Sequence, residues 1–474
     1  MRAFRSAPLL LSLLAAGCTM GPHPKPASSL QVPGAWRTAL PASASASASA
    51  PAAAGAGIVA RDWWRSFGDP ALDALVRRAL DGNGDLRIAR TRIAEYRARV
   101  RVAESAGLPA LNLSLGPTRA RSIGPLGQPI ETTSVVGAVQ ASYELDLFGR
   151  IAETTEAARF EALSQEAAAD AAALAIVANT ASGYFNLLGL DAQLALARAT
   201  LASRERSFAL ARHQFEVGYS SRLEMSQAEA ELHATAAVVP QLERAIAQQE
   251  QALNLLAGAS PGPVARGVAL QGVRLPELIP SPGLPSELLR RRPDIAQAER
   301  LVAASDAALA AARDQLLPAI RLTASLGAQG GSIARLLRDP VELWSVGGSV
   351  LAPIFDAGRL RAQADIAATV RDRAIFAYEN AVRAGFAETE NALAGIDGLR
   401  RQLAEAQARS RAAGEVLRVA HNRYANGYAS YLEELDAQRN AFNAETTVLQ
   451  LRASLLAAHV DLYRALGGGW TPAP

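Results

Sequence analysis

Two short stretches of this chain repeat the same turn: FEVGYSSRLEMSQA at residues 215–228 and YANGYASYLEELDA at residues 424–437. Each stretch places Gly-Tyr between a long proline-free segment and a second segment with helical periodicity. Glycine supplies the positive φ that a tight turn between two helices needs. The two glycines, Gly218 and Gly427, are 209 residues apart. We therefore expect two helical hairpins with equivalent tips.

The same spacing of 209 residues recurs along most of the chain, which indicates an internal duplication. Asp85 matches Asp294, and the same offset joins the further pairs Pro109 and Pro318, Arg150 and Arg359, and Gly258 and Gly467. The predicted organisation is a first repeat at residues 61–267, a second repeat at residues 268–469 and a tail at residues 470–474.

Each repeat has the same order of elements. An opening helix, at Pro70–Gly107 and again at Ser286–Leu316, ends at Leu-Pro. Two segments with alternating apolar and polar residues follow, as in ALNLSLG and AIRLTASLG, which is the period of a β-strand. The chain therefore carries four predicted strands.

The segments after the strands predict very long helices. Residues 150–216 and 359–425 contain no proline and are rich in Ala, Leu, Glu, Arg and Gln. Each would extend roughly 100 Å if unbroken. Return helices are predicted at residues 220–258 and 429–467. A return helix and an opening helix together match one long helix in length, so we expect them to meet end to end.

The N-terminus reads as an export signal at residues 1–17, with basic residues, an apolar run and small residues before Cys18. Cys18 is the only cysteine, and its position predicts lipid modification; an ordinary signal with an incidental cysteine is the alternative. Residues 18–60 are predicted to be a lipidated tether that contains an Ala/Ser-rich low-complexity linker. Trp63, Trp64 and Phe67 then predict a packing anchor for the first helix.

Composition argues against several classes of function. The net charge is only +3, with both signs interleaved, so no nucleic-acid partner is expected. The five histidines are scattered, and no nucleophile, base and orienting group stand together. We therefore expect no metal site, no cofactor and no enzymatic activity.

The alternating strands fit either a soluble sheet or a membrane barrel. Beyond the signal we expect no uncharged apolar run long enough to span a bilayer, and the export signal implies an envelope location. Four strands cannot close a barrel, because edge strands in lipid leave backbone groups unpaired. Two copies would supply eight strands around a filled interior, and three would supply twelve around a pore.

At this point the chain resembles the outer-membrane efflux proteins of the TolC and OprM kind, in particular their NodT-type lipoprotein branch. The resemblance covers nearly all of the mature chain. It rests on DWWRSFGDPALDALVRRAL, LPALNLSLG, YELDLFGR, RRRPDIAQAE, LPAIRLTASLG, APIFDAGR, the two Gly-Tyr turns and the ending YRALGGGW.

The resemblance implies an α+β membrane protein: a homotrimer with a 12-stranded outer-membrane β-barrel, four strands per chain, continuous with a long periplasmic α-helical barrel. Such a protein is the exit duct of a tripartite pump for small toxic molecules or drugs. Its partners would be outer-membrane lipids, a periplasmic adaptor (membrane fusion) protein and an inner-membrane transporter of the resistance-nodulation-division type. The location would be the bacterial outer membrane, lipid-anchored and projecting into the periplasm.

The resemblance also assigns roles to the helical tips. The adaptor would dock on the turns, at Val217, Gly218, Tyr219, Asn426, Gly427 and Tyr428. A periplasmic gate would be formed by Tyr424, Glu433 and Asp436, with Glu224 as the first-repeat equivalent of Glu433. The alternatives are that the glycines only cap helices and that the acids are ordinary solvated residues.

Threefold symmetry would bring the gate carboxylates close together. At about 6 Å and an effective dielectric constant of about 20, each pair of like charges repels by roughly 3 kcal/mol. Water, a cation or protons must offset this repulsion, which predicts a cation-selective constriction. Because the first repeat has Gln227 where the second has Asp436, the second repeat is expected to dominate the gate.

Two other functions fit parts of the pattern. One is the exit channel of a type I protein secretion system, whose pore would look similar. The other is a lipid-anchored coiled-coil spacer without a channel, which would have no need of four alternating strands.

Overall fold

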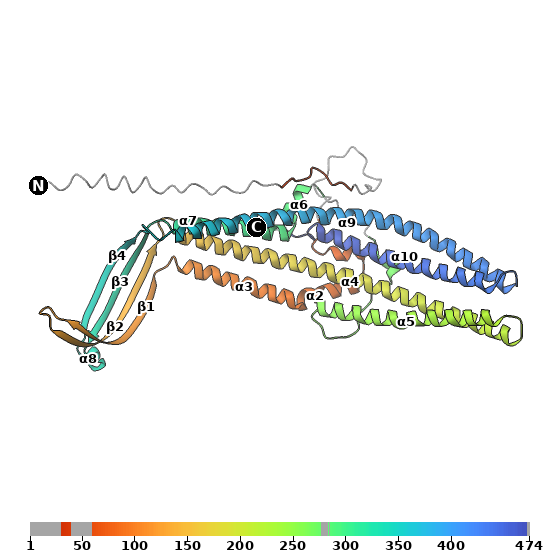
Figure 1. The fold of residues 1–474 in the computed structure, drawn as a ribbon, viewed down its shortest axis with the longest axis horizontal. Coiled ribbons are helices and arrows are strands. Elements are labelled where there is room, and N and C mark those ends of the chain that lie inside the picture. The colour runs from red at the N-terminus through yellow and green to blue at the C-terminus, as the bar shows by residue number, and fades with distance from the viewer. Residues whose placement is uncertain (1–29, 39–58, 276–282, 284, 472–474) are drawn as a thin grey trace. The chain divides into compact units, whose positions relative to one another are not determined.

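The computed structural model describes residues 30–38, 59–275, 283 and 285–471 (Figure 1). The described chain is mostly helical, with one small sheet. The predicted signal at residues 1–17, the lipidation site Cys18 and the Ala/Ser-rich part of the tether lie outside the described residues.

The chain divides into two compact units, and each is built from both sequence repeats. The first unit contains residues 91–166 and 297–380, which include all four strands. The second contains residues 30–90, 167–296 and 381–474, which include both Gly-Tyr turns.

The first unit contains the four predicted strands in one antiparallel sheet. They are β1 (Ala110–Ile123), β2 (Pro129–Leu145), β3 (Ala319–Gly330) and β4 (Val341–Leu351), hydrogen-bonded in the order β1-β2-β3-β4. The two hairpins, which come from different sequence repeats, therefore join through β2 and β3. Figure 1 shows these strands side by side.

The register sorts the strand residues into an apolar and a polar face. One row across the sheet runs Leu113, Val139, Leu326 and Trp344. The neighbouring row, which points to the other side, runs Asn112, Gln140, Ser325 and Ser345. The predicted alternation is confirmed, and the large side chains of the apolar row are exposed.

Both edges of this sheet are open. Among the described residues, β1 and β4 pair with a neighbour on one side only. A short helix that the sequence pattern did not predict, α8 (Ile333–Arg338), lies between β3 and β4 and contacts β2 and β3.

The two long helices have the predicted bounds. They are α4 (Arg150–Glu216) and α9 (Arg359–Ala425), 67 residues each. An aspartate caps the start of each: Asp146 accepts hydrogen bonds from the backbone nitrogens of Ile151 (3.1 Å) and Ala152 (2.8 Å), and Asp356 accepts one from Leu360 (2.9 Å).

Helix α4 corrects one expectation from the sequence. No residue between Asp170 and Asp191 is charged, and α4 is long and apolar enough to cross a membrane by length and composition alone. Half of the most apolar 18-residue stretch of α4 is buried inside the protein. Ile176, Tyr184 and Phe185 are among the buried side chains of this helix. These side chains give α4 the burial of a helix that packs against protein.

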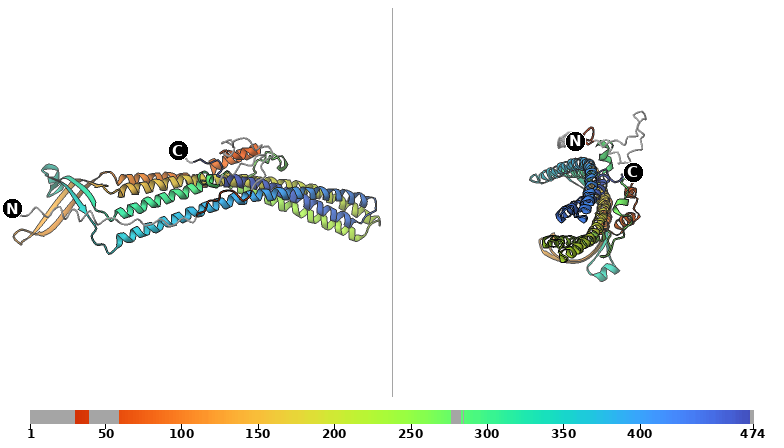
Figure 2. Two further views of the ribbon diagram at one scale, coloured as in Figure 1. Left: turned by 90° about the horizontal axis from the view of Figure 1, so that it is seen from above. Right: turned by 90° about the vertical axis from the view of Figure 1, so that its right-hand side faces the viewer.

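The return helices are α5 (Arg222–Leu256) and α10 (Tyr431–Ala465), slightly shorter than predicted. Each folds back along its long helix (Figures 1 and 2). Helix α5 includes Pro240, and Ser221 caps its start by accepting a hydrogen bond from the Glu224 backbone nitrogen. Two helical hairpins thus lie in the second unit.

The opening helices are each broken in two, where the sequence pattern predicted one helix. The first copy contains α2 (Pro70–Gly82) and α3 (Gly84–Ser105), and the second contains α6 (Pro285–Arg291) and α7 (Pro293–Asp314). Asn83 is extended and its side chain caps α3 through the nitrogens of Asp85 and Leu86. Pro293 begins α7, because proline suits the first turn but not a helix interior.

The return helices meet these breaks, as expected from their lengths. The Asn83 side chain donates a hydrogen bond to the Leu256 carbonyl at the end of α5 (2.8 Å). The Arg292 guanidinium donates one to the Ala465 carbonyl at the end of α10 (3.1 Å). Both pairs of positions are related by the offset of the internal repeat, so the duplication preserves the joint with a different donor.

The N-terminal part of the second unit packs onto these helices. Trp63, Trp64 and Phe67, in η1 (Trp63–Phe67), are buried, and Trp63 stacks on Tyr463 of α10 with ring centroids 4.9 Å apart. Their predicted role as an anchor is confirmed. A second 3-10 turn, η2 (Leu270–Gly272), lies in the connection between the repeats.

Residues 30–38 of the predicted tether are docked on the protein. Trp36 packs edge-on against Phe386 of α9, with ring centroids 6.1 Å apart, and donates a hydrogen bond to the Gly283 carbonyl. The backbone nitrogen of Thr38 donates to Glu390 (3.2 Å). This part of the tether is therefore held against α9.

Candidate functional site

The two Gly-Tyr turns have nearly the same backbone geometry. Gly218 and Gly427 have φ values of 81° and 75°. The Tyr219 nitrogen donates to the Gln214 carbonyl (2.7 Å), and the Tyr428 nitrogen donates to the Arg423 carbonyl (2.8 Å). This closure, six-to-one in form, is the one that glycine permits at a helix end. The predicted turn conformation is confirmed at both sites.

The turns present apolar and aromatic groups to solvent. Tyr219 is 87% exposed and Tyr428 is 78% exposed, and Val217 is also exposed. Asn426 is held by its side chain, which donates to the Asn422 carbonyl (2.7 Å). Large exposed apolar groups gathered at a turn are typical of a contact surface.

Tyr424 belongs to a small core that ties the two hairpins together next to the turns. The buried members are Ala211 of α4, Ala228 of α5, and Tyr431 and Leu435 of α10, with Phe208 and Tyr424 packed against them. The Tyr424 hydroxyl donates to the Gln214 side chain of α4 (3.1 Å). Burial raises the pKa of Tyr424, and the charges of Glu224 and Glu434 add to the shift.

The three predicted gate carboxylates lie in this region. No described hydrogen bond joins one of them to another. Glu433 makes an ion pair with Arg423 of α9 (3.0 Å). Asp436 is exposed and accepts a hydrogen bond from Asn440, one helical turn later (3.1 Å). Glu224 is half-buried on α5. Arg423 thus supplies Glu433 with a counter-ion inside one chain.

The structure adds a buried polar network that sequence reasoning missed. Arg204 of α4 is almost wholly buried and donates to Gln438 of α10. Its Nε lies 3.7 Å from Glu231 of α5, which also pairs with Arg439 of α10 (2.7 Å). Burial lowers the pKa of Arg204, whereas Glu231 raises it. The network links three helices just behind the turns.

The network continues to α9. Gln438 donates to Glu434 (2.9 Å), whose side chain is 3% exposed. The same carboxylate lies 2.9 Å from Nδ1 of His421 on α9. The buried acid of α10 is therefore Glu434, the immediate neighbour of Glu433, which faces solvent.

A comparison of the two repeats could have located this network. Arg204 corresponds to Ala413 and Glu434 to Met225, so a charged residue in one copy replaces an apolar residue in the other. Such a replacement at a helix–helix contact indicates a polar group that must find a buried partner. The duplication was recognised from residues that are identical in both repeats. Arg204 and Glu434 differ between the repeats, so a search for identities passes over them.

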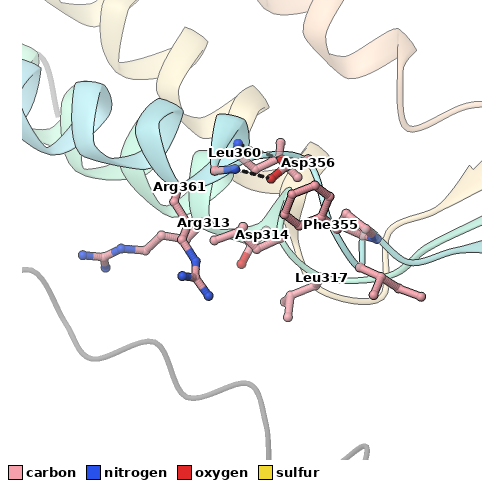
Figure 3. A pocket seen from close by; sticks show the side chains of 11 residues that line it. Arg313, Asp314, Leu317, Phe355, Asp356, Leu360 and Arg361 are labelled. Atoms are coloured by element: carbon pink, nitrogen blue, oxygen red, sulfur yellow. Dashed lines mark hydrogen bonds between the residues drawn. The ribbon is translucent and has the colours of Figure 1, made fainter.

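A hollow lies in the first unit, where β4 leads into α9 (Figure 3). Its labelled side chains include Arg313, Asp314, Phe355, Asp356 and Arg361, and the Asp356 carboxylate is engaged in capping α9. Phe355 is almost fully exposed. The hollow contains charges of both signs and an apolar rim, without a nucleophile paired to a base.

Within the part of the chain that the structure describes, no group of three or more His, Cys, Asp or Glu side chains could hold a metal ion. The turns therefore offer an exposed contact surface and charged side chains.

Comparison with known proteins assigns the family. The family described as "Outer membrane efflux protein" matches residues 75–259 and 284–468. The starts of the two matched stretches, and likewise their ends, are separated by the offset of the internal repeat. The match covers most of the folded chain.

Relatives and solved structures agree with this match. The chain is 35% identical to outer membrane protein OprJ of Pseudomonas aeruginosa over 477 residues, covering 99% of this chain and 96% of OprJ. It is 35% identical to the antibiotic efflux pump outer membrane protein ArpC of Pseudomonas putida over 413 residues, covering 86% of this chain and 85% of ArpC.

Among solved structures, the open state of the MtrE outer membrane channel of Neisseria gonorrhoeae superposes with a TM-score of 0.82 and 30% identity. The match covers 95% of this chain and 98% of MtrE. The duplicated order of helix, hairpin and long helices, the family match over both repeats and the similarity to OprJ along nearly its whole length lead to one conclusion: this chain belongs to the outer membrane efflux protein family.

Proposed function

We propose that three copies of this chain enclose one pore through the outer membrane and form the exit duct of a tripartite efflux pump. The observation that carries the proposal is the sheet: four antiparallel strands with two open edges, one apolar face and one polar face. Because the strand number is even, β1 of one copy can pair antiparallel with β4 of the next. Three copies then supply twelve strands without a free edge.

The two faces suit the two sides of such a barrel. The exposed apolar row at Leu113, Leu326 and Trp344 would meet lipid, and the row at Gln140, Ser325 and Ser345 would meet water. Where β2 leads into α4, Glu144 of the polar face pairs with Arg150 (2.6 Å). The polar side thus offers charges that are already neutralised within the chain.

The turns are the proposed docking surface for a periplasmic adaptor protein. Chain order places each turn at the end of a long helix whose start follows a strand, so the turn is the part of the hairpin reached last from the sheet. The matching backbone conformation at Gly218 and Gly427 and the exposed Tyr219 and Tyr428 support this role. The adaptor would connect the duct to an inner-membrane transporter of the resistance-nodulation-division type.

The proposed gate lies next to the turns, with Glu433 and Asp436 of three copies forming rings of carboxylates. Arg423 neutralises part of this charge, and Asp436 keeps no described cationic partner within the chain. Tyr424 and Glu224 complete the constriction from α9 and α5. The Arg204 network behind them would hold α10, and so the carboxylates, in place.

We propose small toxic molecules, including antibiotics, as the exported class, since ArpC is an antibiotic efflux protein. Lipid modification of Cys18 would add an anchor in the outer membrane. Both the export signal and this anchor precede the described residues.

A thiol-accessibility experiment tests the pore. Ser325→Cys and Leu326→Cys place a thiol on the polar and on the apolar face of the same strand. In planar bilayers, a charged water-soluble thiol reagent should lower the current of the Ser325→Cys channel and leave that of Leu326→Cys unchanged. The wild-type protein supplies the background of Cys18. Equal effects at both positions, or block at Leu326→Cys alone, would contradict the assignment of the two faces.

A further inference from the structure

Helix α8 lies over one end of the apolar face of the sheet. Its Leu336 packs where β2 and β3 carry Gly137 and Gly330. The backbone nitrogen of Leu336 would lie only 2.5 Å from a Cβ at Gly330, so glycine is what allows the helix to approach. Gly330 pairs in register with Val135, which is buried although Val139, farther along the same face of β2, is exposed. One turn of helix therefore covers this end of the face.

The connectivity of the strands identifies which end this is. The strand ends at Ala110, Leu145, Ala319 and Leu351 lead to helices, whereas the loop after β1 and the loop containing α8 lie at the opposite end. If the helices project into the periplasm, as in the proposed duct, α8 lies at the level of the outer leaflet. This inference rests on that proposed function.

The surface of α8 that faces away from the sheet combines apolar and cationic groups. Leu337 is 79% exposed and Ile333 is 64% exposed, which is costly in water for a surface with no role. Arg335 and Arg338 are also exposed, and no ion pair is described for either side chain. Asp339 and Glu342, which follow α8 in the chain, are acidic. The positive charge of this segment therefore lies on the helix itself.

We propose that α8 is an interfacial anchor that inserts Ile333 and Leu337 into the outer leaflet and binds lipid phosphate groups with Arg335 and Arg338. The occupant is the leaflet, because the helix continues the apolar face that Leu113, Leu326 and Trp344 present to lipid. Guanidinium groups bind phosphate through paired hydrogen bonds, and an apolar surface edged by basic side chains is typical of interfacial helices.

The anchor can be tested with the full-length protein in lipid nanodiscs. Leu337→Cys is labelled with a fluorophore, and quenching by a spin-labelled phospholipid is measured. Leu113→Cys, in the middle of the apolar face, is the control for lipid contact. Leu126→Cys, in the β1–β2 loop at the same end of the sheet, is the control for water, since Leu126 is also exposed. Labels at positions 337 and 113 should be quenched, and the label at 126 should not.

The charge is tested with discs of phosphatidylcholine alone and with added lipid A, which carries phosphate groups. Lipid A should bind more tightly to the wild type than to the Arg335→Gln/Arg338→Gln variant, by about five-fold for each arginine removed. Arg409→Gln/Arg411→Gln removes the same charge from α9 and should have no effect. Inorganic phosphate should not compete at the concentration of lipid phosphate.

The outcomes separate this inference from the function on which it rests. If position 113 is quenched and position 337 is open to water, the anchor is wrong and the barrel stands. If position 337 is shielded from both lipid and water, a neighbouring copy covers α8 and the inference also fails. Equal lipid A binding by the variant, or equal competition by inorganic phosphate, overturns the lipid-phosphate assignment. If position 113 is not quenched, the proposed membrane barrel itself fails.

Discussion

Asp69 shows how one side chain can hold several segments of this fold. Its buried carboxylate accepts hydrogen bonds from the backbone nitrogens of Ala71 (2.8 Å), Leu72 (3.3 Å) and Val268 (3.2 Å), and from the Tyr184 hydroxyl (2.8 Å). It therefore caps α2, contacts α4 and fixes the connection between the two repeats. Burial is the main cause of the raised pKa of Tyr184.

Replacing Asp69 with alanine should destabilise the protein by about 2–4 kcal/mol, because a helix cap is lost and buried donors are left unpaired. Thermal unfolding followed by circular dichroism measures the effect. Asp62→Ala is the matched control, since Asp62 pairs with Arg65 at the surface, and it should change stability by less than about 0.5 kcal/mol. Equal effects of the two variants would contradict the role assigned to Asp69.

Substitutions at the turn glycines can distinguish an effect on backbone conformation from an effect on side-chain contacts. No atom lies within 4 Å of the position of a Cβ at Gly427, so a larger side chain meets open space and only the positive φ resists it. Gly427→Val should therefore distort the turn at a cost of about 1–2 kcal/mol, whereas Gly427→Asn should keep it, because asparagine tolerates this region.

Cells that depend on the protein for efflux report the result. Gly427→Val should lose resistance at normal levels of assembled protein, and Gly427→Asn should retain it. Loss of assembly in Gly427→Val would assign the glycine to folding instead of docking, and full resistance with Gly427→Val would exclude both.

At this scale the sequence located positions that glycine chemistry dictates. Gly218 and Gly427 were predictable because only a few residues accept a positive φ. Arg204 and Glu434 could not be recognised from their own helices, because a charged residue on a helix is usually solvated. The apolar residues at the equivalent positions of the other repeat are the sequence sign of their burial.

At the scale of elements, the junction of α4 and α7 concentrates negative charge. Burial raises the pKa of Glu153 at the start of α4, and the charge of Asp314 on α7 adds to it. Burial also raises the pKa of Asp314, with a further contribution from Asp146. The folded protein therefore holds protons on Glu153 and Asp314 at a pH where the unfolded chain has released them.

These shifts give the sign of a pH dependence. Above the ordinary pKa values of 4.5 and 3.8, the unfolded state binds fewer protons than the folded state, so the contribution of these groups to stability falls as pH rises. Glu153→Gln/Asp314→Asn should raise the free energy of unfolding at pH 7 by up to about 1 kcal/mol, and the unfolding temperature with it. The fall of stability as the pH rises from about 4 should become less steep.

The control for this charge effect is Glu95→Gln, which breaks an exposed pair with Arg99 one helical turn away. It should leave the slope of stability against pH unchanged. A steeper fall of stability in the double variant than in the wild type would show that the sign of the effect is reversed.

The elements were predictable to different degrees. The bounds of α4 and α9 could be predicted because each proline-free segment starts at a Gly-Arg pair and ends at a Gly-Tyr turn. The break at Asn83 was not predictable from periodicity, since asparagine is tolerated inside helices and the break depends on the end of α5. Helix α8 was not predicted because six residues are too few to show a helical period.

At the scale of the whole molecule, charge at the turns should control ion flow. Glu433→Gln/Asp436→Asn removes two carboxylates per chain while preserving size, so planar bilayers should show a higher conductance and a weaker preference for cations. Glu415→Gln, in an exposed pair with Arg418 on α9, should change neither property. Unchanged conductance and selectivity in the double variant would remove both acids from the proposed gate.

The duplication made the family and the four strands accessible from sequence, because the same strand pattern occurs twice. The joining of β2 to β3 and the two open edges required the structure. Assembly into three copies is proposed from those edges, and transport is proposed from that assembly.

The most direct test of the proposed export function is the sensitivity of cells that lack this protein to antibiotics, dyes, detergents and metal ions, with and without the restored gene. The account predicts that cells lacking it become more sensitive to at least one class of small toxic molecule, accumulate that compound, and recover when the gene is restored. Unchanged sensitivity across the whole panel, together with the loss of a secreted protein from the medium, would contradict small-molecule efflux and favour protein export.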